Sequence, residues 1–174
     1  MKRKRGKGKR GQEVFGLSFG MIFAIILAIF FIILAIIVIN SFLNMQNCSK
    51  IGIFVKELNE KVDNVWNSND ASIEYVGYLP SAIQYVCFVN LTESFSGQNS
   101  AFGASLRTFN HKDNFFFHPT KKSCDLAGHI IKNLDIPQIT LSENPLCINV
   151  VNGKVRMTIG KESNLPLVTI KKTL

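Results

Sequence analysis

The chain has 174 residues and a formal net charge of +8, and 47% of its residues are hydrophobic. Seven basic residues lie among the first ten positions, whereas the part after Asn40 carries 13 basic and 11 acidic residues. The excess charge belongs to one short segment, so the high isoelectric point is no evidence for a nucleic-acid-binding surface. We expect no nucleic-acid partner.

A long apolar segment follows the basic residues. No side chain from Met21 to Ile39 is polar, and the weakly polar approach from Val14 extends the segment to 26 residues, or roughly 39 Å of helix. This exceeds the hydrocarbon core of a bilayer, about 30 Å, and the apolar region of a signal peptide, roughly 7 to 15 residues. No small-residue cleavage pattern follows Ile39. We therefore predict a retained transmembrane helix at 13–43.

The basic residues set the orientation of this helix. Lysine and arginine beside a membrane span resist translocation, so the tail at 1–12 is predicted to stay in the cytoplasm. The remainder is predicted to lie outside the cell. The chain is then a single-pass protein of the cell surface, and the membrane is its partner.

The next segment, 44–67, is predicted to be an amphipathic helix that continues into the exterior domain. Apolar residues recur there at steps of three and four, as a helical stripe requires. They are Ile51, Phe54 or Val55, Leu58, Val62, and Val65 or Trp66. Polar residues occupy the other side, so the stripe needs a surface on which to pack.

Residues 68–174 are predicted to form a β-rich domain. The runs 73–79 and 83–89 alternate as strands joined by a tight connection, and 106–109 and 115–117 flank a polar turn as a short hairpin. Asn152-Gly153 lies between two β-prone runs, as a type I′ turn requires. The fold class that follows is α+β, with a long N-terminal helix packed on a mostly antiparallel sheet.

Two further features concern the strands. Residues 165–170 are predicted to form a last strand that Pro166 places at an edge or at a strand start. The run Phe115-Phe116-Phe117 must face both sides of a strand. Its members are expected either to be buried on both faces or to mark a contact site.

Four cysteines lie in the predicted exterior part, where disulfides persist. They are Cys48, Cys87, Cys124 and Cys147, and we expect one or two bridges among three possible full pairings. Two glycosylation sequons, at Asn90 and Asn47, agree with an exterior location.

The chain begins with a basic leader that ends in Lys9-Arg10-Gly11-Gln12, followed by an acidic residue and a long apolar helix. An amphipathic continuation and a β-rich head come next. This order resembles that of archaeal type IV pilin-like proteins with class III signal peptides. The resemblance implies that a prepilin peptidase cuts between Gly11 and Gln12. Removal of the charged leader would let the apolar helix leave the bilayer and assemble with identical helices in a filament. The partners implied are the peptidase and further copies of the chain.

One position departs from that family. Many pilins carry glutamate at the fifth mature position, where Gly16 stands here, and Glu13 is the nearby acid. Gly16 and Gly20 form a small-xxx-small step that allows close helix packing in a membrane. We predict Glu13, Gly16 and Gly20 as assembly positions. The alternative is an unprocessed, membrane-anchored extracellular adaptor or accessory subunit of a larger complex.

Candidate chemistry is sparse. One nitrogen and sulfur set suits zinc in principle, namely His111, His118, Cys124 and His129, but it lacks the close pairs of zinc motifs. No nucleophile elbow, P-loop or H-E-x-x-H motif occurs in the sequence. We expect no metal, no cofactor and no enzymatic activity. A membrane-tethered hydrolase or zinc enzyme is the third hypothesis.

Overall fold

The structure, a computed structural model, describes residues 19–68, 70–110, 112–124, 127–163 and 165–173. The chain divides into two compact units, Met1–Leu43 and Asn44–Leu174. A single helix, α1 (Phe19–Trp66), contributes residues to both. Every other described element belongs to the second unit.

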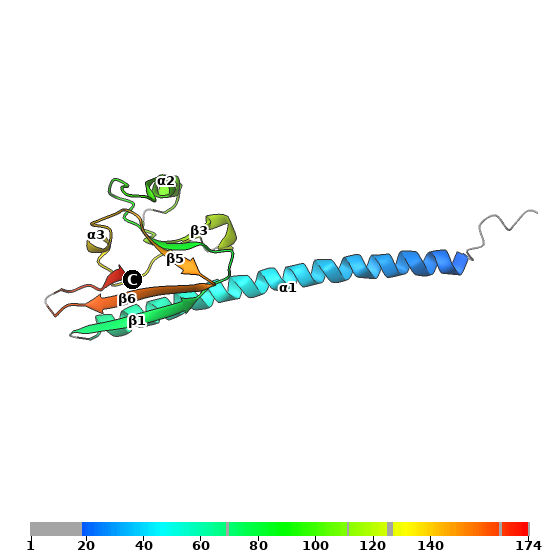
Figure 1. Ribbon diagram of the computed structural model, residues 1–174, viewed down its shortest axis with the longest axis horizontal. Helices are drawn as coiled ribbons and strands as arrows, with labels where there is room; N and C mark the ends of the chain where they lie inside the picture. The colour runs from blue at the N-terminus through cyan, green and yellow to red at the C-terminus, as the bar shows by residue number, and fades with distance from the viewer. Residues whose placement is uncertain (1–18, 69, 111, 125–126, 164, 174) are drawn as a thin grey trace, which may run out of the picture. The chain divides into compact units, whose positions relative to one another are not determined.

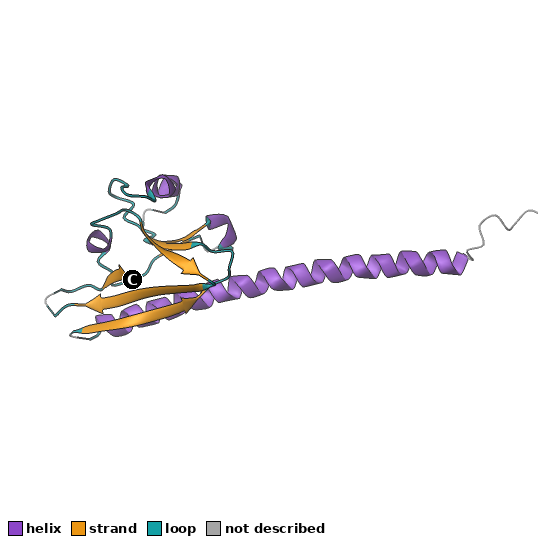
Figure 2. Cartoon of the chain, viewed as in Figure 1, coloured by secondary structure: helices purple, strands orange, loops and turns teal. Residues whose placement is uncertain are grey.

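The second unit combines a sheet with short helices, as Figure 2 shows. In chain order its further elements are β1 (Ala71–Tyr78), β2 (Tyr85–Phe88), α2 (Ser100–Ser105), β3 (Phe115–His118), β4 (Gly128–His129), α3 (Ile136–Ile139), β5 (Leu146–Val151), β6 (Lys154–Lys161) and β7 (Thr169–Lys172). Short 3-10 turns occupy Leu106–Thr108 and Thr120–Lys122. The predicted α+β fold class is confirmed.

The sheet has the strand order β1-β6-β5-β2-β3-β4, with β7 also paired to β6, and its ladders are antiparallel. β1 occupies one edge of β6 along its whole length. On the other edge, β5 pairs with Lys154 and Val155, and β7 pairs from Met157 to Gly160. Arg156 therefore lies on β6 between the residues that pair with β5 and those that pair with β7. We call this place the fork.

The C-terminal part of α1 packs on one face of this sheet, running along β1 and β6 (Figure 1). The predicted stripe is buried, with each of the following side chains at most 2% exposed: Ile51, Phe54, Leu58, Val62 and Val65. The Phe54 ring lies 6.0 Å from the Tyr75 ring and 6.2 Å from the Phe115 ring, measured between centroids. The stripe is thus one wall of the main hydrophobic core.

A smaller apolar cluster covers the opposite face of the sheet at β2, β3 and β5. Its fully buried members are Cys87, Val89, Leu106, Phe116 and Cys147. The segment that contains α2 supplies Phe95, Phe102 and Phe109 as its cover. Phe115, Phe116 and Phe117 are all fully buried, because both faces of the sheet are covered there. The reading of this triplet as a strand buried on both faces is confirmed.

The hairpin predicted from 106–109 and 115–117 is wrong, whereas the strands predicted at 73–79 and 83–89 are present and pair with other strands. The runs around β1 and β2 do form strands, but β1 pairs with β6 because that strand offers eight partners, from Lys154 to Lys161. β2 pairs instead with β3 and β5. Residues 106–108 form a 3-10 turn and pack Leu106 into the smaller cluster, so they are no strand partner for β3.

The hairpin between β5 and β6 is confirmed. Asn152 and Gly153 have φ angles of 51° and 70°, the left-handed values that a type I′ turn needs at both positions. The last strand, β7, is also present, and it begins at Thr169, after Pro166. The proline lacks a donor for a strand ladder, which is why the pairing starts beyond it.

Candidate membrane-spanning and assembly helix

The first part of α1, from Gly20 to Leu43, has an apolar surface on all sides except at Asn40 and Ser41. Among these residues only Leu27 is half-buried, and the rest are exposed. Seventeen large apolar side chains are exposed there, from Met21 to Leu43. α1 is the only helix within the described part of the chain that is long and apolar enough to cross a membrane.

The surface of this segment has a clear energetic consequence. Covering one large apolar side chain is worth roughly 1.5–3 kcal/mol, so seventeen of them represent tens of kcal/mol. The twenty residues from Gly20 to Ile39 span about 30 Å as helix, which matches the hydrocarbon core of a bilayer. The segment therefore fits a single-span, membrane-anchored protein.

The second part of α1 is fixed to the head by covalent and polar links. Cys48 forms a disulfide with Cys124 across a sequence separation of 76. At the C-terminal end of the helix, the Trp66 indole donates a hydrogen bond to the Pro166 carbonyl at 3.0 Å. The Lys161 ammonium donates to the Trp66 carbonyl at 2.7 Å, where a cation also complements the helix dipole.

Trp66 does not take the buried end of the stripe. The stripe is predicted to end at Val65 or Trp66, and Val65 takes the buried place at 2% exposure whereas Trp66 is 40% exposed. The indole acts as a hydrogen-bond donor at the end of the helix instead.

Most predicted processing and assembly residues lie outside the described part of the chain. These are Lys9, Arg10, Gly11, Gln12, Glu13 and Gly16. Gly20 is described, and it lies exposed in α1. Helix packing through the Gly16–Gly20 step stays a prediction.

The remaining two cysteines join neighbouring strands. Cys87 of β2 lies opposite Cys147 of β5 in the ladder, and the two form the second disulfide. All four candidate cysteines are thus bridged within the chain. Both bridges belong to the second unit, so that unit is a disulfide-stabilised β-rich domain.

The two sequons lie in different local structures. Asn47 is within α1, where the Ser49 hydroxyl donates to the Met45 carbonyl at 3.1 Å. Asn90 is 7% exposed, and its side-chain oxygen accepts from the Thr92 hydroxyl at 2.7 Å and from the Thr92 amide at 3.1 Å. Glycosylation at either stays a prediction.

The zinc candidates are not brought together in the described part of the chain. Cys124 is in a disulfide, and His111 lies outside the described residues. His118 lies on the same sheet face as Phe116, and its ring centroid is 4.6 Å from that of Phe102. His129 lies opposite Phe115 in the ladder, on the other face of the sheet. Among the described residues, no three His, Cys, Asp or Glu side chains could hold a metal ion together.

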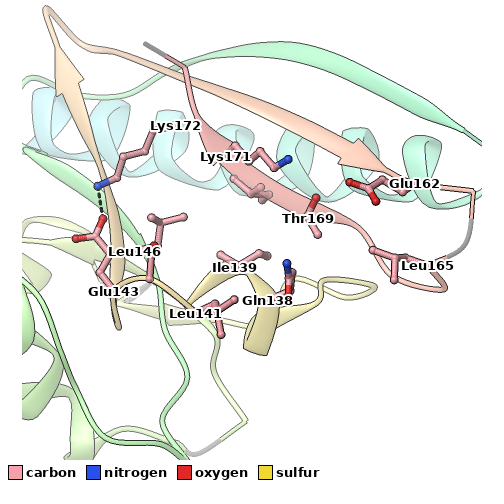
Figure 3. Close-up of a pocket in the computed structure, with 12 residues that line it drawn as sticks. Gln138, Ile139, Leu141, Glu143, Leu146, Glu162, Leu165, Thr169, Lys171 and Lys172 are labelled. Atoms are coloured by element: carbon pink, nitrogen blue, oxygen red, sulfur yellow. Dashed lines mark hydrogen bonds and ion pairs between the residues drawn. The ribbon is translucent and has the colours of Figure 1, made fainter.

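The head also has a hollow of about 660 Å³ between α3 and β7 (Figure 3). Ile139 and Leu141 line one side, and Thr169 and Lys171 line the other. Lys172 and Glu143 form an ion pair at one end. Its described lining contains no histidine or cysteine.

Sequence reasoning passed over two exposed cations of β6. Lys154 and Arg156 stand two residues apart in a strand, so both project from the same sheet face, away from α1. The sequence indicates them by the alternation Lys-Val-Arg directly after the Asn152-Gly153 turn.

No protein-family model, curated protein or solved structure matches this chain.

Proposed function

We propose that this chain is a non-enzymatic, single-span surface protein that serves as a pilin-like subunit of an extracellular filament. The observation that carries the proposal is the Gly20–Leu43 part of α1, which is exposed and apolar all round and continues into the core of the head. Such a surface is removed from water in lipid, and it can also be removed from water against the same surface of other copies.

The proposed orientation places the basic tail in the cytoplasm and the head outside. Seven basic residues precede the apolar helix and resist translocation. The two disulfides of the head favour an oxidising exterior, since thiols in the cytosol are kept reduced.

Cleavage of the leader is the proposed switch from anchor to subunit. A prepilin peptidase would cut between Gly11 and Gln12 and remove all seven basic residues before the helix. Because moving charged side chains through hydrocarbon is costly, the intact leader would hold the chain in the membrane. Without it, α1 can pass from lipid into a bundle of identical helices.

The contacts proposed within that bundle come from the start of the helix. Gly16 and Gly20 let two backbones approach closely. Glu13 would pair with the amino group of Gln12 in a neighbouring copy. The chain's partners are thus the membrane, the peptidase and itself.

One observation favours a second function, that of an unprocessed anchor for an extracellular adaptor or accessory subunit. Gly16 stands where the resemblance leads us to expect a glutamate. An anchor would need neither that acid nor the cut at Gly11.

The amino terminus of the protein from native membranes separates these two functions. We expect it to be Gln12, and we expect Gly11→Val to leave the leader attached and to prevent filament formation. Gly8→Val, a matched change in the same leader, should be cleaved normally. An intact Met1 tail on the mature wild-type protein would overturn the pilin proposal and leave the anchor.

A further inference from the structure

One region of the sheet surface is not covered by the described residues of the chain. The α2 segment covers β2, β3 and β5 on the face opposite α1, but on that same face β1 and β6 are open. Glu74 and Tyr78 of β1 and Lys154 and Arg156 of β6 are exposed there. The covered and open parts of the face meet at the fork.

A hollow of about 650 Å³ lies at this boundary, and we call it the basic groove. β6 contributes Lys154 and Arg156, the end of β7 contributes Lys172 and Thr173, and the covering segment contributes Gln98. The remaining lining residues come from β5 and its turn: Ile148, Asn149, Val151 and Asn152. Arg156 stands at the fork, where β5 and β7 have separated.

The groove has an unbalanced charge. Three cations line it, and none of its described lining residues is acidic. Lys172 is neutralised by Glu143, and the Lys154 ammonium lies 5.7 Å from the centroid of the Tyr78 ring. The guanidinium of Arg156 makes no hydrogen bond or ion pair with the described residues, although its backbone lies in the ladder opposite Val76. Glu74, opposite Thr158 on the same face, does not pair with it.

We propose that the basic groove binds a carboxylated carbohydrate. The guanidinium of Arg156 offers a planar pair of donors that matches a carboxylate, and Lys154 adds a second charge. The amide side chains of Gln98, Asn149 and Asn152 can donate to and accept from sugar hydroxyl groups. Tyr78 presents an exposed ring beside Lys154, on which the apolar face of a sugar can pack.

The lining favours a carbohydrate over a nucleic acid. Single-stranded nucleic acids bind along extended cationic tracks with several aromatic rings for base stacking. The basic groove has two uncompensated cations and one adjacent ring, Tyr78, among its described residues. Three neutral amides, Gln98, Asn149 and Asn152, stand beside these two cations in its polar lining.

This inference does not depend on leader cleavage or filament assembly. The groove lies wholly within the second unit, so binding can be measured on the full chain in a nonionic detergent. If the groove binds no carbohydrate, the pilin proposal still stands. If the leader is not cleaved, the proposed binding in the groove still stands.

The experiment compares two double variants of equal net charge. Lys154→Gln with Arg156→Gln removes both uncompensated cations of the groove. Arg107→Gln with Lys132→Gln removes two exposed cations that do not line it. Binding is measured by calorimetry at about 0.15 M salt, where charges separated by more than about 8 Å are screened. The probes are an oligogalacturonate, a neutral galactose oligomer, a sulfated dextran and a single-stranded DNA oligonucleotide.

We expect the wild type and the control variant to bind oligogalacturonate within about twofold of each other, and the groove variant to bind at least tenfold more weakly. The neutral oligomer should bind at least tenfold more weakly than oligogalacturonate to the wild type. Equal loss in both double variants would overturn the site, and so would undetectable binding to the wild type. Tighter binding of sulfated dextran or DNA than of oligogalacturonate, lost in the groove variant, would overturn the carboxylated carbohydrate as its ligand.

Discussion

The two parts of α1 belong to one helix but meet opposite demands. From Gly20 to Leu43 nearly every side chain is apolar and exposed, whereas from Asn44 to Trp66 a narrow apolar stripe is buried and most of the other side chains are polar. The first part finds no cover among the described residues of its own chain. The second part is a wall of the head's core.

This difference shows that the helix is specified by two different environments. An all-round apolar helix requires lipid or other apolar helices, and an amphipathic one requires a single packing surface. Changes in the second part should therefore alter the stability of the head. Matched changes in the first part should alter its stability little.

The largest expected effect comes from the bridge that holds the second part of α1 to the head. Cys48→Ser with Cys124→Ser opens a loop with a sequence separation of 76, and we expect the free energy of unfolding of the head to fall by about 4 kcal/mol. Denaturant titration in detergent, followed by the fluorescence of the single tryptophan, measures this. Retention in the membrane fraction should not change, and an unchanged unfolding midpoint would show that the bridge contributes nothing.

A pair of leucines tests the comparison most evenly. Leu58 is fully buried in the head, so Leu58→Ala should cost about 3 kcal/mol of unfolding free energy. Leu34 in the first part is 40% exposed, and Leu34→Ala should leave the unfolding of the head within about 0.5 kcal/mol of the wild type. Similar losses in both variants would mean that the two parts of the helix are not energetically distinct.

Two glycines sharpen the boundary between packed and open surface within the head. A Cβ at Gly77 of β1 would lie 2.2 Å from a ring carbon of Phe54, so Gly77→Ala should destabilise the head by about 2 kcal/mol. Nothing lies within 4 Å of a Cβ at Gly52 of α1, and Gly52→Ala should stabilise it by about 0.5–1 kcal/mol. Thermal melts would show shifts of opposite sign, and a gain at Gly77 would contradict the close packing of β1 on the helix.

A further expected effect is a pH dependence in the packed core. Burial, and then the negative charge of Glu57, raise the pKa of the Tyr75 hydroxyl above its ordinary value of 10.0. The folded state therefore keeps this proton when the unfolded chain has lost it. The contribution of Tyr75 to the free energy of unfolding is therefore fully present below about pH 10. It declines above that pH, and the loss reaches about 1.4 kcal/mol at about pH 11.

Matched phenylalanine variants isolate this contribution. Between about pH 9 and 11, Tyr75→Phe should lose about 1.4 kcal/mol less than the wild type. Tyr78→Phe, at a ring that is 63% exposed, should follow the wild type. Identical pH profiles for all three proteins would contradict the burial of the Tyr75 hydroxyl.

The parts of the fold with local periodicity were predictable from the sequence. The stripe from Ile51 to Val65 and the turn at Asn152-Gly153 depend on neighbouring residues, and both are confirmed. The partner of β1 was not predictable, because β6 lies about eighty residues further along the chain and competes with the nearer β2.

The candidate site was predictable to a similar degree. The apolar length of α1 is written in consecutive residues, but the pairing of Cys48 with Cys124 is one of three possibilities that spacing cannot separate. The basic groove depends on the fork between β5 and β7, which exists only once the long-range strand pairs have formed.

The most direct test of the proposed membrane span is the labelling of lysines in sealed cells with an amine reagent that does not cross membranes. The head carries exposed lysines such as Lys132 and Lys171, which mass spectrometry can resolve from the tail. We expect both to be labelled in intact cells, and any remaining Lys2–Lys9 peptides to be labelled only after lysis. Head lysines that stay unlabelled until the cells are opened would contradict a span with its basic end inside.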